Sequence, residues 1–259
     1  MNAKYPKMLT AVTVVVLLTG AYACASEIDE RIESSAKNSY VFKTYLKDDA
    51  IKTQSKDGVV TLTGTVNEEF HKSLAQETVA NLPGVKSVDN QLVLKGEQPP
   101  ENSDGWLALK VKTALLFHRN VNAFKTKVDV KDGVVTLKGE AASQAQKDLA
   151  GEYAKDVAGI KDGKNEMTLV KVPENTEQTI NEKIDDASIT VQVKFALLSH
   201  HSTSAVKTNV GTSNGVVTIG GIAKNDAEKA LVSKLANDVK GVIKVVNNMT
   251  VDDSSSKKK

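Results

Sequence analysis

The sequence predicts an α+β protein built from three tandem α-β-β-α-β modules, and two observations support this. An octet of turn and β-branched residues occurs three times, at Asp57 to Gly64, Asp132 to Gly139 and Asn214 to Gly221. The spacing beyond each octet is also repeated: 26 residues after the turn glycine comes another glycine, and six residues later an asparagine. These positions are Gly84, Gly159 and Gly241, then Asn90, Asn165 and Asn247. A fixed period of this kind is typical of repeated structural units.

Residues 1–25 differ from the rest of the chain and predict a signal peptide. Lys4 and Lys7 are the only charges, and an uncharged, mostly apolar run of 13 residues follows from Met8 to Gly20. This layout is typical of secretory signals, and the run is shorter than the roughly 20 residues of a membrane-spanning helix. Two processing sites are compatible with the sequence: cleavage before Ser26, or cleavage before Cys24 with acylation of that cysteine. Because Cys24 is the only cysteine, we expect no disulfide and no cysteine metal site.

Each octet is interpreted as the corner of a β-hairpin followed by a strand. Asp-Gly and Asn-Gly supply the positive φ of tight turns, and the Val-Val-Thr-Leu/Ile run favours a strand. The strands before the turns are expected at residues 51–56, 125–131 and 206–213. The glycines assigned to turns, bends and helix ends are Gly58, Gly64, Gly84, Gly133, Gly139, Gly159, Gly215, Gly221 and Gly241.

Two helices and a last strand complete each module. After the octet, apolar residues recur at i, i+3 and i+4, most clearly at Ala227, Ala230, Leu231 and Leu235, which predicts an amphipathic helix. The glycine 26 residues after the turn ends this helix. The closing strands are expected at residues 87–94, 164–170 and 243–251. A further helix precedes each hairpin, at about 106–118 and 189–200, and the corresponding segment of the first copy is shorter.

Together, the Asp-Gly-Val-Val-Thr-Leu-x-Gly motif, the helix and the closing Gly-Val-x-x-Val-x-Asn strand resemble the BON domain, over nearly all of residues 27–253. The resemblance implies that two helices pack on one face of a small three-stranded mixed sheet. It also implies phospholipid binding at envelope membranes and a role in osmotic or envelope stress. The second copy departs from the pattern at Lys164, which stands where the others have Asp89 or Val246. We therefore expect this strand to be frayed or to lie at an edge.

The predicted organisation is a signal peptide at 1–25, BON modules at 26–96, 103–172 and 184–253, and a disordered tail at 254–259. The segments 97–102 and 173–178 are polar and contain proline. Such composition is typical of linkers, so we expect some relative motion of the modules. Aromatic residues make up only 4% of the chain, which favours several small cores over one large core.

Composition and motifs exclude several classes of function. A formal net charge of +2 is too small for a nucleic-acid binder, which normally has a clustered basic surface. The Asp-Gly turns join strand to strand and lack the helix N-terminus that holds phosphate, and there is no Gly-x-Ser-x-Gly elbow. Paired carboxylates lie at predicted element ends, where solvation accounts for them. We expect a protein that is not an enzyme and has no cofactor and no small-molecule substrate.

The histidines are the remaining candidates for chemistry. Of His71, His118, His200 and His201, only His118 and His200 occupy equivalent repeat positions. A site built on that pair would require the second and third modules to face each other. Because no carboxylate cluster or cysteine stands beside them at ligand spacing, we expect exposed histidines at helix ends and no metal.

The first helix of the middle module is the candidate binding surface. Residues 103–172 contain 12 Lys/Arg and 9 Asp/Glu, against 9 and 11 in residues 27–96 and 7 and 7 in residues 184–253, so the middle module is the basic one. Within its helix, Leu107, Val111, Ala114 and Leu115 form the expected core stripe. Apolar and basic residues around that stripe are Trp106, Leu109, Lys110, Lys112, Leu116, Phe117 and Arg119.

Rings beside cations suit an interfacial contact with anionic lipid, and packing of one module on another explains the same residues equally well. With the resemblance, we expect a periplasmic protein, acylated at Cys24 or soluble, that binds anionic phospholipid surfaces and helps to maintain the envelope. The alternative is a protein-partner adaptor or chaperone-like protein that uses the same helix against envelope proteins.

Overall fold

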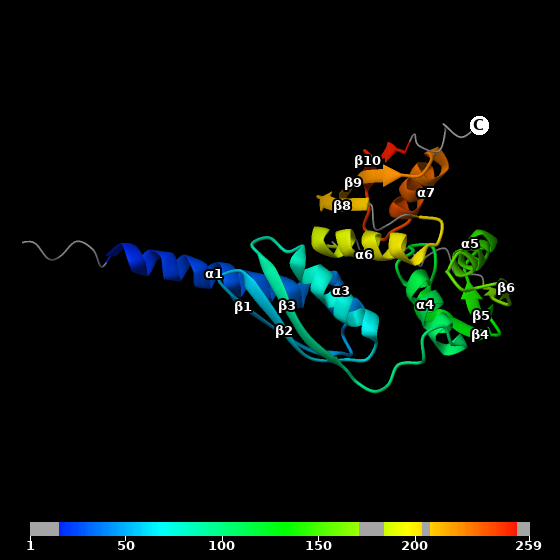
Figure 1. Cartoon of the computed structure of the whole chain (residues 1–259), viewed down its shortest axis with the longest axis horizontal. Helices are drawn as coiled ribbons and strands as arrows, with labels where there is room; N and C mark the ends of the chain where they lie inside the picture. The colour runs from blue at the N-terminus through cyan, green and yellow to red at the C-terminus, as the bar shows by residue number, and fades with distance from the viewer. Residues whose placement is uncertain (1–15, 171–183, 204–207, 253–259) are drawn as a thin grey trace, which may run out of the picture.

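A computed structural model of the chain describes residues 16–170, 184–203 and 208–252. The predicted tail at 254–259 and the segment 173–178 lie outside these residues, as do residues 1–15 of the predicted signal peptide. Figure 1 shows three small α+β modules, the first coloured blue to cyan, the second green and the third yellow to red. The predicted fold class of three tandem modules is confirmed.

The first module begins with a long helix that extends away from the body (Figure 1). Its elements are α1 (Val16–Asn38), α2 (Tyr40–Thr44), β1 (Ala50–Lys56), β2 (Val59–Val66), α3 (Glu69–Ala80) and β3 (Ser87–Leu94). β2 is central, pairing antiparallel with β1 and parallel with β3, which gives the predicted mixed sheet. Among the described residues, no helix has the length and apolar character to cross a membrane.

The second and third modules repeat this plan. The second comprises α4 (Asp104–Leu116), a 3₁₀ turn η1 (Ala123–Lys125), β4 (Thr126–Lys131), β5 (Val134–Ala141), α5 (Gln144–Lys155), β6 (Asp162–Asn165) and β7 (Thr168–Leu169). The third comprises α6 (Asp186–Ser199), β8 (Thr208–Ser213), β9 (Val216–Ala223), α7 (Asp226–Asn237), β10 (Lys244–Asn247) and β11 (Thr250–Val251). β5 and β9 are the central strands.

The hairpin corners have the backbone conformation that their sequence favours. Gly58, Gly133 and Gly215 have φ of 80°, 79° and 74°, and the residue before each is also at positive φ. An aspartate on the first helix of each module holds the corner; it begins the helix in the second and third modules and lies within α1 in the first. Asp104, for example, accepts hydrogen bonds from the N–H groups of Asp132 and Gly133 at 2.9 and 3.1 Å. Asp29 and Asp186 do the same in the other modules.

The closing strand is interrupted in both the second and the third modules, so the charge of Lys164 does not explain the break. In each module the side chain of the repeated asparagine accepts a hydrogen bond from the backbone N–H two residues later. These asparagines are Asn90, Asn165 and Asn247. The Asn165 side chain accepts from Met167 at 3.2 Å and also donates to the carbonyl of Lys147 on α5 at 2.6 Å. This asparagine therefore ties the closing strand to the helix that packs on it. Asn90 makes the same bonds in the uninterrupted β3, so they do not by themselves break the strand. All three closing strands lie at the edge of their sheets.

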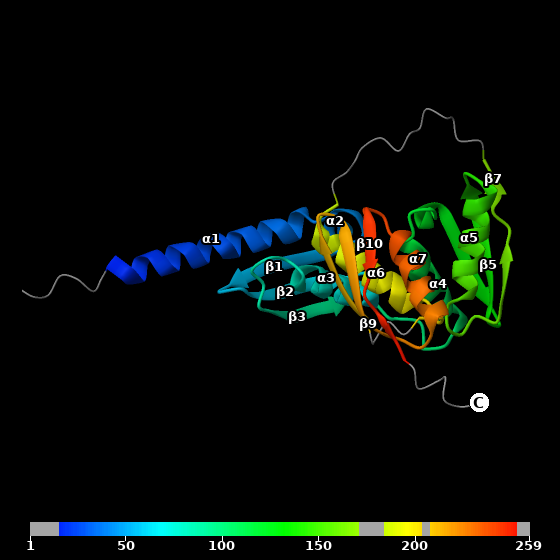
Figure 2. The same cartoon turned by 90° about the horizontal axis from the view of Figure 1, so that it is seen from above.

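The modules pack on one another in this structure, although the segments that join them are polar. The first and third modules share a single apolar core, and only the second has a core of its own. α6 lies between the modules, against α3 on one side and α4 on another (Figures 1 and 2). It is buried over most of its length, including the polar Ser188 and Gln192.

Polar contacts fix the first module on α6. Asp185 accepts a hydrogen bond from the Tyr40 N–H at 2.8 Å, and Ser188 Oγ accepts from the Val41 N–H at 3.1 Å. These are the first N–H groups of α2, which a helix cannot satisfy from within. The Tyr45 hydroxyl completes the contact by donating to Gln192 Oε1 at 3.1 Å. The third module thus supplies acceptors for the first two N–H groups of α2, while Ser39 caps the helix from within the first module by accepting from the Phe42 N–H.

Candidate functional site

α4 is the helix on which the sequence places a binding surface. Ser103 caps its N-terminus by accepting a hydrogen bond from the Trp106 N–H at 3.2 Å. The predicted core stripe is buried, comprising Leu107, Val111, Ala114 and Leu115. This orientation leaves two other faces of the helix, one toward the first module and one toward the third.

The C-terminal end of α4 faces the other modules and not solvent. Phe117 is 1% exposed and contacts Tyr45 and Phe195, with ring centroids 5.3 and 5.9 Å apart. Leu116 is partly buried against both apolar cores. In this packed arrangement Phe117 is covered and Leu116 is partly covered, so a lipid-facing role for Phe117 would require the modules to separate at this junction. The sequence could not distinguish the two roles, because a ring buried between modules and a ring inserted in lipid leave the same apolar pattern.

Arg119 also belongs to this module contact. Its guanidinium donates to the carbonyls of Val239 and Val242, both at 2.8 Å, at the end of α7 in the third module. Its backbone N–H donates to the Asp238 carbonyl at 2.7 Å. A cation that satisfies carbonyls at a helix C-terminus is favourably placed in the helix dipole. The side chain is thus occupied in holding the third module.

Trp106 and Lys110 remain on the surface as a half-buried pair. The Lys110 ammonium lies 4.5 Å from the centre of the Trp106 ring and donates to the carbonyl of Ala158 at 3.2 Å. Burial lowers the pKa of Lys110 below its ordinary value, and the charge of Glu101 opposes this shift. An anion brought to this ammonium would favour its charged form.

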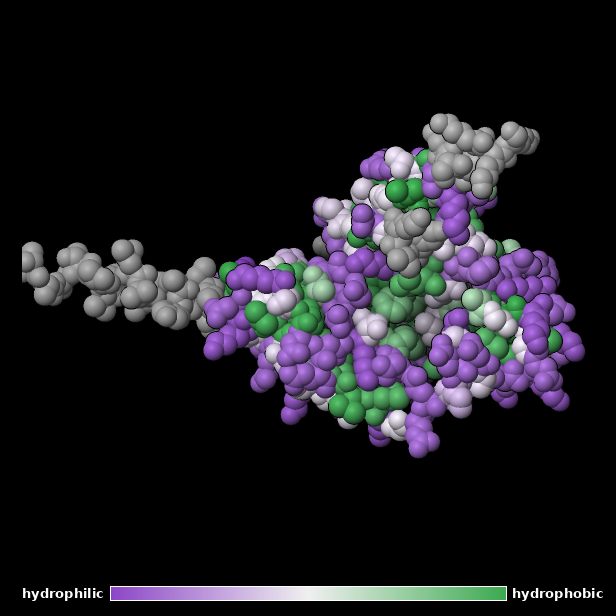
Figure 3. Space-filling model, in the orientation of Figure 1, coloured by the Kyte–Doolittle hydropathy of each residue, from purple (hydrophilic) through white to green (hydrophobic). Residues whose placement is uncertain are grey.

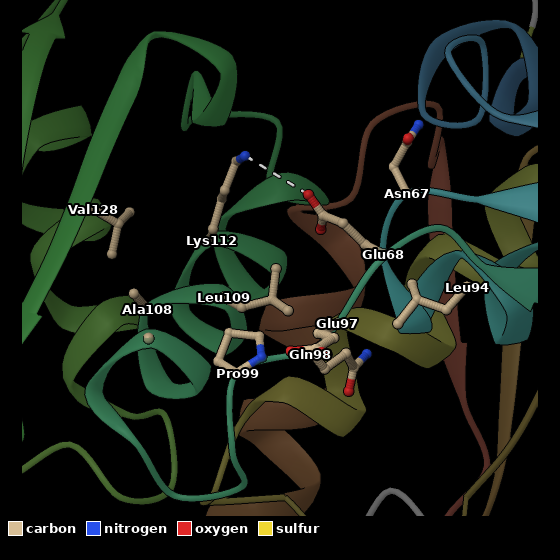
Figure 4. A pocket seen from close by; sticks show the side chains of 11 residues that line it. Asn67, Glu68, Leu94, Glu97, Gln98, Pro99, Ala108, Leu109, Lys112 and Val128 are labelled. Atoms are coloured by element: carbon tan, nitrogen blue, oxygen red, sulfur yellow. Dashed lines mark ion pairs between the residues drawn. The ribbon is translucent and has the colours of Figure 1, made fainter.

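Leu109 and Lys112 face a groove of about 330 Å³ between the first and second modules. Its apolar lining includes Leu94, Pro99 and Val128. Lys112 and Glu68 approach to 4.0 Å across the groove, as the dashed line in Figure 4 shows. On the face drawn in Figure 3, apolar residues gather in the hollow where the modules meet, and the rim is mostly hydrophilic. Two residues of the predicted site, Leu109 and Lys112, thus line this groove.

The histidines provide a second cluster, and the prediction that they are exposed is wrong for two of them. His118 and His200 are 2% and 3% exposed, and their Nε2 atoms lie 3.0 Å apart between the second and third modules. His118 Nδ1 lies 3.0 Å from Asp238 Oδ2, and His200 Nδ1 lies 2.8 Å from Asp156 Oδ2. The two modules face each other, as a site on this pair requires. No set of three or more His, Cys, Asp or Glu side chains in the described part of the chain could hold a metal ion.

Tyr153 covers this pair from α5. Its ring stacks on His118 with centroids 3.8 Å apart, and its hydroxyl donates to Asp238 Oδ2 at 2.8 Å. Burial, and then the hydrogen bond to Asp238, raise the pKa of Tyr153. No role was predicted from the sequence for Asp156 or Asp238, although the repeat contains a signal for both. Asp156 and Asp238 are 82 residues apart, as are His118 and His200, so both pairs occupy equivalent repeat positions.

Comparison with known proteins agrees with the repeat. The BON domain matches residues 28–96, 103–171 and 185–253. Osmotically-inducible protein Y of Escherichia coli strain K12 is 30% identical over 146 residues, which are 56% of this chain and 71% of that protein. The outer membrane lipoprotein DolP of Haemophilus influenzae is 28% identical over 136 residues, 51% of this chain and 70% of DolP.

Among solved structures, the C-terminal domain of CdsD is similar. CdsD is a structural protein of the type III secretion system of Chlamydia trachomatis. Its domain is 17% identical, with 82% of this chain and 94% of that chain covered and a TM-score of 0.22. The three consecutive matches to one domain, over the modules that the structure contains, establish the family. The chain belongs to the BON domain family, with three copies in tandem.

Proposed function

We propose that this chain is an exported, non-enzymatic envelope protein of the osmotic or envelope stress response that binds anionic phospholipid surfaces through the exposed side of α4. The binding residues are Trp106, Leu109, Lys110 and Lys112. Relatives named as osmotically inducible and as an outer membrane lipoprotein support the envelope location. Residues 1–25 act as its signal peptide, with processing before Ser26 or at Cys24.

The observation that carries the proposal is the combination of groups left on this side of α4. The half-buried Trp106 indole lies under the Lys110 ammonium, and Lys112, two residues farther along the helix, stands beside an apolar groove. Indole rings settle at the level of lipid headgroups, and each nearby cation contributes about 1 kcal/mol toward an anionic surface. The Lys112–Glu68 contact at 4.0 Å is exposed, and such pairs are worth little. Lys112 is therefore free to exchange Glu68 for a phosphate.

A second candidate function follows from the charge of the groove. Glu68 and Glu97 line it together with Lys112, so its rim is not uniformly basic. Carboxylates beside Leu94 and Leu109 suit an apolar peptide segment that carries a cation. The protein-partner adaptor therefore remains the alternative, with the groove as its binding site.

Flotation with lipid vesicles separates these functions. Lys112→Gln should weaken binding to phosphatidylglycerol vesicles roughly fivefold, which corresponds to the loss of about 1 kcal/mol per cation. Trp106→Ala should weaken it further, and binding to purely zwitterionic vesicles should be poor. Lys127→Gln is the matched control, because it removes the same charge from an exposed position on β4 of the same module.

If folded Trp106→Ala and Lys112→Gln proteins float as well as the parent protein, lipid binding by α4 is refuted. If the parent protein does not float with vesicles but captures envelope proteins from an extract, and both variants fail to capture them, the adaptor function replaces lipid binding as the proposed function.

A further inference from the structure

The contact between the second and third modules is built from two equivalent halves. His118 at the end of α4 bonds Asp238 after α7, and His200 at the end of α6 bonds Asp156 after α5. Each histidine thus pairs with the aspartate of the other module, and the two Nε2 atoms meet at 3.0 Å. Because the halves are related by the repeat, the arrangement resembles the self-complementary interface of a two-fold dimer.

The hydrogen bonds fix how many protons the two rings hold. Each Nδ1 faces a carboxylate oxygen at 3.0 Å or less, and a carboxylate only accepts, so both Nδ1 atoms carry hydrogen. At an Nε2 separation of 3.0 Å, one Nε2 donates and the other accepts. The fully bonded pair therefore holds three protons on four ring nitrogens. This leaves one positive charge shared by the two rings, between two carboxylates.

We propose that His118 and His200 form a proton-sensitive lock that holds the second module on the third with one shared proton and opens when the pair takes a second. A second proton would place two N–H groups head to head at the shared contact. It would also put two like charges in a buried space, where they repel more strongly than in water. The rings relieve both effects only by separating, and with them the modules.

The surroundings of the pair set the direction of this response. Asp238 is bound by the Tyr153 hydroxyl and the Asn120 amide, and Asp156 by the Ser202 hydroxyl at 2.7 Å. The Arg119 guanidinium is directed to carbonyls of the third module. Both carboxylates thus accept hydrogen bonds from donors outside the histidine pair, and they lie on either side of its single positive charge.

Burial, and then the charge of His118, lower the pKa of His200 below 6.5, while Asp156 and Asp238 oppose the shift. In the open state the ring is exposed and takes up a proton near the ordinary histidine pKa of about 6.5. Below about pH 6.5 the two open rings together approach four protons while the closed pair holds three, so closure weakens as the pH falls toward the lowered pKa of His200. Above about pH 6.5 the open rings lose protons while the closed pair keeps its shared one, so closure weakens there as well and is strongest near pH 6.5. If opening takes up one proton, the ratio of closed to open molecules falls by up to about tenfold for each unit by which the pH is lowered.

The lock acts on the junction that covers the end of α4. Phe117 precedes His118 at 1% exposure and Arg119 follows it, so opening uncovers the Phe117 ring and frees the Arg119 guanidinium from the carbonyls of Val239 and Val242. The proposal concerns the contact between the modules alone and does not depend on lipid binding.

Amide hydrogen exchange, measured by NMR on the full mature chain without lipid, tests the lock. Two backbone N–H groups bridge the modules: Arg119 donates to the Asp238 carbonyl and His201 to the Asp156 carbonyl. Their protection factors should fall up to about tenfold per unit between pH 6.5 and 5.5. The Val41 N–H, which bridges the first and third modules to Ser188 Oγ, should keep its protection. Constant protection of Arg119 and His201 would overturn the proposal.

Variants and ring titration complete the test. Joint replacement of His118→Gln and His200→Gln should remove the pH dependence, and His71→Gln should preserve it, because His71 pairs with Asp49 inside the first module. Loss of the response in His71→Gln would refute the assignment. If the double variant is open at every pH, nitrogen-15 spectra of the parent rings decide. They should show both Nδ1 atoms protonated at neutral pH and a second proton taken up only as protection is lost. Two independent, ordinary titrations would refute the lock.

Discussion

Replacing Phe117 with alanine tests whether the end of α4 is part of a module junction. The ring is 1% exposed and lies against Tyr45 of the first module and Phe195 of the third. Truncating a fully buried phenylalanine to alanine costs about 3–5 kcal/mol through lost transfer energy and the cavity left behind. For a chain of this size, 1 kcal/mol corresponds to about 2–4 °C in Tm. Phe117→Ala should therefore lower the first unfolding transition by on the order of 10 °C.

Differential scanning calorimetry measures this effect, and Leu198→Ala is its control. Leu198 is an apolar residue of α6 that is 56% exposed, so its truncation should change stability by no more than about 0.5 kcal/mol. Phe117→Ala should also lower the protection of the Arg119 amide at neutral pH, because that bond crosses the same junction. A Phe117→Ala protein that melts like its parent but loses vesicle binding would refute the buried assignment and restore this ring to the membrane surface.

Two other outcomes are expected. Gly139→Ala should cost several times more stability than Gly133→Ala. A Cβ on Gly139 would lie 2.2 Å from the Lys125 carbonyl oxygen, whereas a Cβ on Gly133 would meet only the flexible Lys161 side chain at 3.2 Å. Equal melting temperatures of the two variants in thermal unfolding would contradict this. Mass spectrometry of the mature N-terminus should show Ser26 or an acylated Cys24, and finding Met1 there would contradict export.

The interior of each module could be predicted from the sequence because its determinants are local. A turn needs Asp-Gly or Asn-Gly, a strand alternates, and a helix repeats its apolar residues every three or four positions. Those rules place the hairpin at Gly133 and the buried stripe at Val111 and Leu115. The Asp104 anchor of the hairpin escaped notice, although it stands 29 residues before Gly133, as Asp29 does before Gly58 and Asp186 before Gly215.

The contacts between modules could not be predicted because they depend on which apolar surfaces meet. α6 has apolar residues around most of its circumference, which indicates burial on several sides without naming the neighbour. The same ambiguity affects Phe117. The histidine positions contain a signal of the contact between modules. His118 and His200 occupy equivalent repeat positions, and an aspartate follows each of them at the same spacing, Asp156 after His118 and Asp238 after His200. Such a repeated pair indicates a contact between two modules when the histidine of each module can bond the aspartate of the other module.

The two kinds of contact in this molecule predict that only one of its junctions responds to pH. The first and third modules share an apolar core, whose stability depends on area removed from water and does not change with protonation. The second module has its own core and meets the third through Phe117, which packs in the shared apolar core, and through His118, His200 and their aspartates. Because a module with its own core stays folded when its contacts are lost, protonation of the histidines releases the second module intact. The first and third modules remain joined through α6 in the process.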